Sequence, residues 1–147
     1  MKYCFILFVL IISSLGYAQT KSVAKTTYNA ELAKQIGADD YGMKPYIFAF
    51  LKEGKTVIKD SAERMKIQMA HLKNIMKLAD EGKLVIAGPF MDDQSMRGIF
   101  IFNVKTLEEA KALTNTDPAV QAGILDMELH PWYGSAALME VVKIHKS

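Results

Sequence analysis

Residues 46–51 read Tyr-Ile-Phe-Ala-Phe-Leu, six apolar side chains without a polar one among them. The run is short, rich in aromatic residues and followed by a turn-like sequence at residues 52–55, which favours a β-strand over a helix. Successive side chains of a strand point to opposite faces, so a strand that is apolar at every position has to be covered on both faces.

Residues 60–81 show the pattern of a long amphipathic helix. Asp60 is a suitable N-cap residue, and Glu63 stands three positions later as the partner expected in a capping box. Gly82 follows as a stop signal. The apolar residues at helical spacing, which are expected to face the core, are Met65, Met69, Leu72, Ile75, Met76 and Ala79.

Two further strands and a second helix follow. Residues 84–89 predict a strand that ends at a Gly-Pro turn, and residues 98–104 predict its antiparallel neighbour. Thr106 and Glu109 form a second capping box, which opens a short helix that ends before the Asp-Pro pair at 117–118. The residues that this helix is expected to bury are Leu107, Ala110 and Leu113.

The last predicted strand, residues 125–132, alternates between apolar and polar side chains, so Leu125, Met127 and Leu129 face the core. The order is therefore strand, helix, strand, strand, helix, strand. This βαββαβ order is that of the ferredoxin-like α+β fold.

Two helices cover only one face of a four-stranded sheet, so its second face needs another cover. We expect a second copy of the sheet, in a homodimer that packs sheet against sheet as a dimeric α+β barrel. A ligand cleft is then expected between the sheet and the helices or at the mouth of the barrel.

The first 18 residues predict a secretory signal peptide, because Lys2 precedes an apolar run at residues 3–12 and a small-x-small site ends at Ala18. We expect cleavage after Ala18 and a periplasmic or secreted protein, if the source is a bacterium, with no membrane attachment. The alternative is a retained transmembrane anchor, which would need roughly 20 apolar residues.

Residues 19–44 predict a linker or N-terminal extension, with a short helix over residues 28–36, before one domain at residues 45–147. The only cysteine, Cys4, lies in the predicted signal peptide, which excludes thiol chemistry and disulfides in the mature protein. The formal net charge is only +2, with acidic and basic residues interspersed, which argues against a nucleic-acid partner.

Several short motifs, taken in their order and spacing between residues 45 and 132, resemble the family of YCII-related domains. They are His71-Leu72 in the long helix, Gly82 at its end, Gly88-Pro89, the helical sequence at 107–110, Asp117-Pro118 and Pro131-Trp132. The resemblance implies a fold similar to muconolactone-isomerase-like dimeric α+β barrels. It also implies enzymatic activity through a His-Asp pair, here His71 and Asp117.

His71 is thus the first candidate catalytic residue, since histidine takes up and releases a proton near neutral pH and a carboxylate can fix its tautomer. The alternative is a hydrogen-bonded residue at the border of an apolar face. Asp117 is either that carboxylate or only a turn or cap residue before Pro118. No nucleophilic serine can be named beside the pair, so proton transfer is favoured over acyl transfer.

Three further residues are candidates for substrate binding. Arg64 lies two helical turns before His71 and can offer a guanidinium group to a carboxylate or an enolate; otherwise it is a solvated helix residue. His130 and Trp132, near the end of the last strand, are expected at the cleft, in the core or at a subunit interface.

The three histidines, His71, His130 and His145, are too scattered for a recognised metal-ligand spacing, and no glycine-rich phosphate loop is present. We therefore predict no metal and no cofactor. Two functions stay open. The first is a cofactor-free lyase or isomerase acting on a small organic acid, and the alternative is a non-catalytic small-ligand-binding or dimeric assembly domain.

Overall fold

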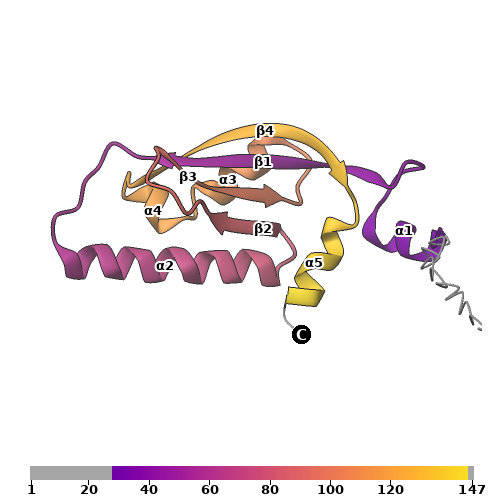
Figure 1. Cartoon of the computed structure of the whole chain (residues 1–147), viewed down its shortest axis with the longest axis horizontal. Helices are drawn as coiled ribbons and strands as arrows, with labels where there is room; N and C mark the ends of the chain where they lie inside the picture. The colour runs from indigo at the N-terminus through magenta and orange to yellow at the C-terminus, as the bar shows by residue number, and fades with distance from the viewer. Residues whose placement is uncertain (1–27, 146–147) are drawn as a thin grey trace, which may run out of the picture.

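The computed structural model describes residues 28–145, so the predicted signal peptide and the first part of the predicted linker lie outside the described residues. In chain order the elements are α1 (Ala30–Ile36), β1 (Met43–Glu53), α2 (Ser61–Asp80), β2 (Leu84–Pro89), β3 (Met96–Phe102), α3 (Leu107–Thr114), α4 (Pro118–Gln121), β4 (Leu125–Ser135) and α5 (Leu138–His145) (Figure 1). The four strands form one antiparallel sheet in the order β2-β3-β1-β4. The predicted α+β class and ferredoxin-like βαββαβ arrangement are confirmed.

The predicted strands differ from the observed ones at their ends. β1 begins at Met43, inside the predicted linker, because Met43 and Lys44 already pair with Ser135 and Gly134 of β4. The short helix expected near residue 30 is α1. β4 extends to Ser135 because β1 offers it a partner along its whole length. Strand ends are thus set by pairing with distant residues, which the local pattern does not contain.

Helix α2 begins where its cap predicts, since the Asp60 carboxylate accepts a hydrogen bond of 2.8 Å from the backbone N–H of Glu63. The predicted buried face is only partly correct: Ile75 packs against the core, whereas the methionines of the predicted set do not. Met65, Met69 and Met76 are about 60% exposed, and the buried residues are His71 and Leu78. Met69 and Met76 lie two turns apart on one face, and His71 and Leu78 two turns apart on the other, so both faces satisfy the helical period.

Helix α3 opens with the predicted capping box: Glu109 N–H donates to the Thr106 hydroxyl (3.1 Å) and Thr106 N–H donates to the Glu109 carboxylate (3.2 Å). Ala110 is fully buried as expected. Leu107, expected in the core, is instead 39% exposed, because it stands in the first turn, at the rim of the helix–sheet contact.

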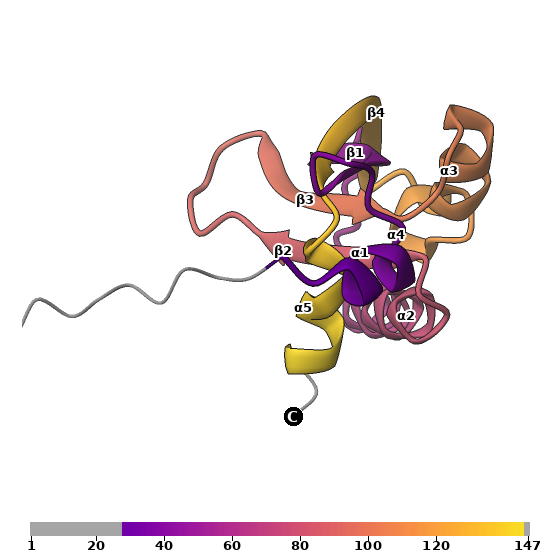
Figure 2. The same ribbon diagram turned by 90° about the vertical axis from the view of Figure 1, so that its right-hand side faces the viewer.

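One face of the sheet packs against α2, α3 and α4, which Figure 2 shows together on one side. The main core lies in this layer. Its buried members are Ile47, Ala49, Leu51, Leu78, Leu84, Phe100, Phe102 and Ala110. Leu125, Met127 and Leu129 of β4 pack against it, which confirms the predicted orientation of that strand.

The other face of the sheet is covered in part by a helix that the sequence did not predict, α5. Leu138 and Met139 of this helix pack on Tyr46, Val85 and Ile101. A second copy of the sheet was the expected cover, whereas the chain itself supplies cover next to β2 (Figure 2). Phe48 and Phe50 on this face remain half-buried, Phe48 at the edge of the same cluster.

Strands β2 and β3 approach so closely at Gly98 that a side chain has no room there. A Cβ atom at this position would lie 2.4 Å from the carbonyl oxygen of Gly88 and 3.0 Å from the Cα of Pro89. Both are backbone atoms, so a strand has to move. We expect Gly98→Ala to lower the free energy of unfolding by about 1–3 kcal/mol. The measurement is urea denaturation followed by circular dichroism.

Gly88→Ala is the matched control for this substitution, because a Cβ atom on Gly88 meets no heavy atom within 4 Å. It is expected to leave the free energy of unfolding within about 0.5 kcal/mol of the wild type. Equal losses in the two variants would show that the close approach of the strands is not what requires glycine at position 98.

Candidate functional site

His71 and Asp117, 46 positions apart in the sequence, are in direct contact. His71 lies on the face of α2 that packs toward the sheet, and Asp117 lies at the turn between α3 and α4. The Nδ1 atom of His71 is 2.9 Å from Oδ1 and 2.7 Å from Oδ2 of Asp117. A carboxylate can only accept, so Nδ1–H is the donor in this pair. The structure brings the predicted pair together.

Asp117 is held in place by a second bond. Its Oδ1 accepts a hydrogen bond of 2.8 Å from the backbone N–H of Ala119, which makes Asp117 the N-cap of α4. The two interpretations of this residue, a cap and a partner of His71, are therefore both correct. The residue is only 1% exposed, so both of its bonds are shielded from water.

A cavity of about 590 Å³ opens between α2 and the sheet, and His71 is one of its lining residues. Its apolar walls include Leu51, Ile75, Pro89, Phe100 and Leu125. The His71 ring also stacks on Phe100, with ring centroids 6.2 Å apart and an angle of 14° between the planes. Since Nδ1 is engaged by Asp117, Nε2 is the nitrogen that His71 can offer to a ligand in this cavity.

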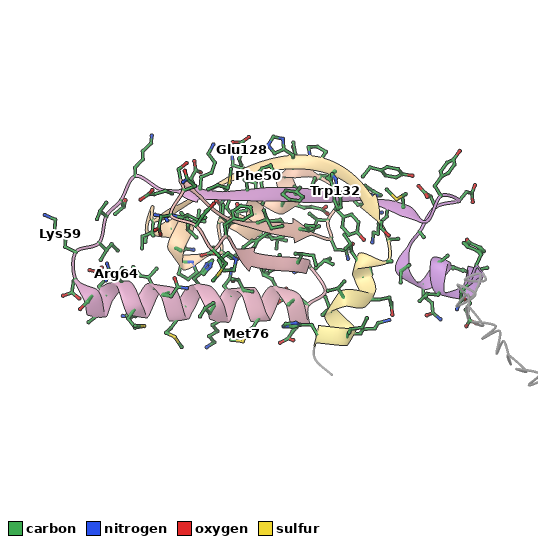
Figure 3. The ribbon with its side chains drawn as sticks, viewed as in Figure 1. Phe50, Lys59, Arg64, Met76, Glu128 and Trp132 are labelled. Atoms are coloured by element: carbon green, nitrogen blue, oxygen red, sulfur yellow. The ribbon has the colours of Figure 1, made fainter. Side chains whose placement is uncertain are left out.

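The polar lining of the cavity contains two arginines. Arg64, the predicted anion-binding residue, lies near the beginning of α2 (Figure 3) and is part of the lining, as expected. Arg97 of β3 is a second lining residue that the sequence did not reveal, and its guanidinium group lies 3.3 Å from the carboxylate of Glu53. Arg97 belongs to the predicted hairpin, but strand alternation alone does not place it on this face.

His130 and Trp132, the other two candidate binding residues, lie on the opposite face of the sheet. Trp132 packs near Tyr46 and Phe48, with ring centroids 5.8 and 5.9 Å apart. His130 Nε2 lies 2.8 Å from the carboxylate of Glu128, which Figure 3 shows on the side of β4 away from α2. Within the single chain, the structure does not bring His130 and Trp132 to the cavity.

Glu128 joins His130 to Lys52 in a surface network. Lys52 donates a hydrogen bond of 2.6 Å to the Glu128 carboxylate. This bond, and to a lesser extent the one with His130, holds the pKa of Glu128 below its ordinary value, and Glu128 in turn raises the pKa of Lys52. The network places charged groups on the same sheet face as the half-buried aromatic residues.

Residues 28–145 contain no group of three or more His, Cys, Asp or Glu side chains arranged to hold a metal ion. No helix in this described range is long and apolar enough to cross a membrane. The ionisable side chains that line the cavity are those of His71, Arg64, Arg97 and Glu53.

Known proteins resemble this chain over the same region. Residues 46–133, which include His71 and Asp117, match the model of a family described as "YCII-related domain". Protein YciI of Escherichia coli and Protein YciI of Shigella flexneri are each 36% identical to this chain over 76 residues. Each alignment covers 46% of this chain and 78% of the relative.

Among solved structures, one similar chain is 5-chloro-2-hydroxyhydroquinone dehydrochlorinase from Burkholderia phenoliruptrix, in complex with 2,5-dihydroxybenzoquinone. It is 22% identical, the TM-score is 0.43, and the match covers 58% of this chain and 92% of that one. A likeness at this level supports no conclusion about the chemistry or the assembly of the present protein.

Proposed function

Because this chain belongs to the family of YCII-related domains, we propose that it is a cofactor-free lyase or isomerase that moves a proton on a small organic acid. One observation carries the proposal: a buried His71–Asp117 pair whose second imidazole nitrogen is available to a cavity of about 590 Å³. A histidine oriented by a carboxylate is a common general base.

The chemistry follows from the two nitrogens of the imidazole ring. Nε2 takes a proton from a carbon beside a carbonyl group, and the electron pair of the broken C–H bond forms an enolate. In an isomerisation the proton returns from Nε2 to another carbon. In an elimination the enolate expels a leaving group together with its bonding pair, and the proton passes to solvent. Asp117 accepts from Nδ1–H and stabilises the imidazolium between these steps.

The walls of the cavity support this chemistry. Ile75 and Phe100 flank an apolar space, where fixed charges interact more strongly than they do in water. Arg64 at the same cavity supplies positive charge for a carboxylate or a developing enolate. No part of this scheme needs a nucleophilic side chain, in keeping with the transfer of a proton rather than an acyl group.

The experiment is a screen for enzyme-dependent deuterium uptake. Small lactone acids and hydroxylated aromatic acids are incubated with the purified protein in D₂O, and the loss of carbon-bound proton signals is followed by proton NMR. Exchange or product formation above the buffer rate in any compound supports the proposal. Binding of these compounds without any exchange favours the second candidate function, a non-catalytic ligand-binding domain. The largely apolar walls of the cavity suit that function as well.

We also propose that the protein is a homodimer joined through the sheet face that carries Phe48, Phe50 and Trp132. These residues form an aromatic cluster, with ring centroids of Phe48 4.9 Å from Phe50 and 5.9 Å from Trp132. Such a cluster on an exposed sheet face is typical of a surface that packs against a partner. Separately, we propose that the protein is exported to the periplasm or the medium through the predicted signal peptide.

Phe50→Arg is expected to weaken this dimer by more than about 100-fold, because it replaces an aromatic side chain of the proposed interface with a longer, charged one that has to be buried there. Sedimentation velocity over a concentration series measures the effect. Met76→Arg is the matched control, since Met76 lies on the side of α2 away from the sheet (Figure 3) and is 60% exposed. If both variants dissociate alike, or the wild type is a monomer, the sheet face is not the interface.

A further inference from the structure

The pairing of β1 with β3 is interrupted at one point. Leu51 pairs with Gly98, but the next residue of β1, Lys52, pairs with Met96. Arg97 is thus the extra residue of a β-bulge. Up to this point the strand alternates regularly, with Phe100 on the face toward α2 and Ile101 on the other. Continued alternation would place Arg97 with Ile101, away from the cavity.

The bulge changes the direction of the Arg97 side chain. Instead of joining the far face, Arg97 lines the cavity that contains His71, and it forms an ion pair of 3.3 Å with Glu53. Glu53 lies two residues after Leu51 on β1 and lines the same cavity. Bulges are frequent beside binding sites, where they redirect a side chain. The cavity therefore has a second guanidinium group that regular strand geometry would not provide.

The two arginines of this cavity come from different elements. Arg64 comes from α2 and Arg97 from β3, so guanidinium groups stand on both walls, helix and sheet. Arg64 precedes His71 by seven residues, which corresponds to roughly 10 Å along the helix axis. The side chains beside His71, Ile75 and Phe100, are apolar. A ligand that satisfies this arrangement has a negative charge at one end and an apolar, planar body that extends toward Nε2 of His71.

The Glu53–Arg97 pair can give way to such a ligand. Both side chains are well exposed, 55% for Glu53 and 40% for Arg97, and exposed ion pairs contribute only about 0–1 kcal/mol. This pair has an N–O contact of 3.3 Å, and a ligand carboxylate bound in two-pronged fashion by the same guanidinium group is held more strongly. Glu53 thus occupies Arg97 in the free protein without blocking it permanently.

We infer that Arg97 is a specificity-determining residue: it selects ligands with a carboxylate, bound between Arg97 and Arg64, while the apolar body lies between Ile75 and Phe100. This inference rests on the proposed use of the cavity as the ligand site. It adds the substrate class, a monocarboxylate with a flat apolar body, and it assigns Glu53 the role of a competitor for Arg97 that the ligand displaces.

The test uses two probes of the same shape, benzoate and benzamide, which differ in charge. Their affinities for the purified protein are measured by NMR titration, without any need for turnover. The wild type is expected to bind benzoate about tenfold more tightly than benzamide, and Arg97→Gln is expected to remove most of that difference. Glu53→Gln is expected to strengthen benzoate binding by about threefold, because it removes the competing carboxylate. Benzamide binding should change less than twofold in both variants.

Lys59→Gln is the control for net charge. Lys59 stands in the loop before α2 (Figure 3), is exposed, and is not part of the cavity lining. Lys59→Gln removes one positive charge, as Arg97→Gln does, but its affinity for benzoate should stay within twofold of the wild type. A gain in affinity for Glu53→Gln cannot result from misfolding, so this variant tests the inference even if Arg97→Gln folds poorly.

The inference is overturned if benzoate does not saturate the wild type, or if Arg97→Gln and Glu53→Gln bind it as the wild type does. Such a result is distinct from a failure of the proposed function. If the protein binds benzoate through Arg97 but never exchanges protons, the inferred ligand class holds and the proposed proton transfer fails. If it exchanges protons on other compounds and Arg97→Gln does not change the rate, the proposed proton transfer holds and the inferred role of Arg97 fails.

Discussion

His71→Gln is expected to slow deuterium uptake into a substrate of the cavity by about 10²–10⁴-fold, the usual contribution of a positioned general base. Glutamine is close to histidine in size and can still donate a hydrogen bond to Asp117, so the buried carboxylate keeps a partner. It cannot take up a proton near neutral pH. The measurement is the first-order rate of exchange at a saturating concentration of a compound that the wild type turns over.

His130→Gln is the matched control for this prediction, because it makes the same chemical change on the opposite face of the sheet, where His130 contacts Glu128. Its exchange rate should lie within twofold of the wild type. Equal losses in the two variants, or full activity in His71→Gln, would remove His71 from the mechanism. The melting temperatures of both variants establish that the comparison is made on folded protein.

Asp117→Ala is expected to lower the free energy of unfolding by about 2–4 kcal/mol. Two contributions add to this value. A hydrogen bond to a charged group contributes about 1.5–3 kcal/mol, and the loss of a helix N-cap costs about 1 kcal/mol. After the substitution, the N–H groups of His71 and Ala119 lose their acceptor in a buried place, since Asp117 is 1% exposed. Urea denaturation provides the measurement.

Two further variants separate these contributions. Asp60→Ala removes an N-cap that lies at the surface and has no histidine partner, so it should cost only about 1 kcal/mol. Asp117→Asn keeps the size and one acceptor oxygen and should cost less than Asp117→Ala. If Asp60→Ala and Asp117→Ala destabilise the protein equally, the bond between His71 and Asp117 does not contribute to stability.

The features of the fold that the sequence predicted correctly are those decided within a few residues. The caps at Asp60 and Thr106 depend only on a side chain and a backbone N–H three positions away. The orientation of Leu125, Met127 and Leu129 follows from the period of two in the same short segment. The resemblance to YCII-related domains, which also rested on short local motifs, is confirmed by the family match.

The features that the sequence missed depend on distant residues. The face of α2 that carries the methionines and the face that carries His71 both fit the helical period. His71 can be buried because Asp117, 46 positions away, accepts a hydrogen bond from its Nδ1–H. Similarly, α5 is stabilised by contacts of Leu138 and Met139 with β1, β2 and β3. The direction of Arg97 depends on the pairing register of β1 and β3, which strand alternation does not encode.

The candidate site shows the same division. Arg64 was placed correctly because its spacing from His71 is a property of one helix. His130 and Trp132 are expected at the cleft, in the core or at a subunit interface. The alternation that points Leu129 to the core turns both of them to the other face of the sheet, so within the single chain they do not reach the cleft. The position of Asp117 beside His71 was implied by the resemblance alone, since nothing in the local sequence brings two such distant segments together.

The most direct measurement on the His71–Asp117 pair is the position of the imidazole proton, read from two-dimensional proton–nitrogen NMR of the histidine side chains. Comparison with His71→Gln identifies the signals of His71 among the three histidines. The structure predicts a proton on Nδ1, bonded to Asp117, and an Nε2 signal that shifts when benzoate is added. A proton fixed on Nε2, or an Nε2 signal that no ligand moves, would contradict a general base at this site.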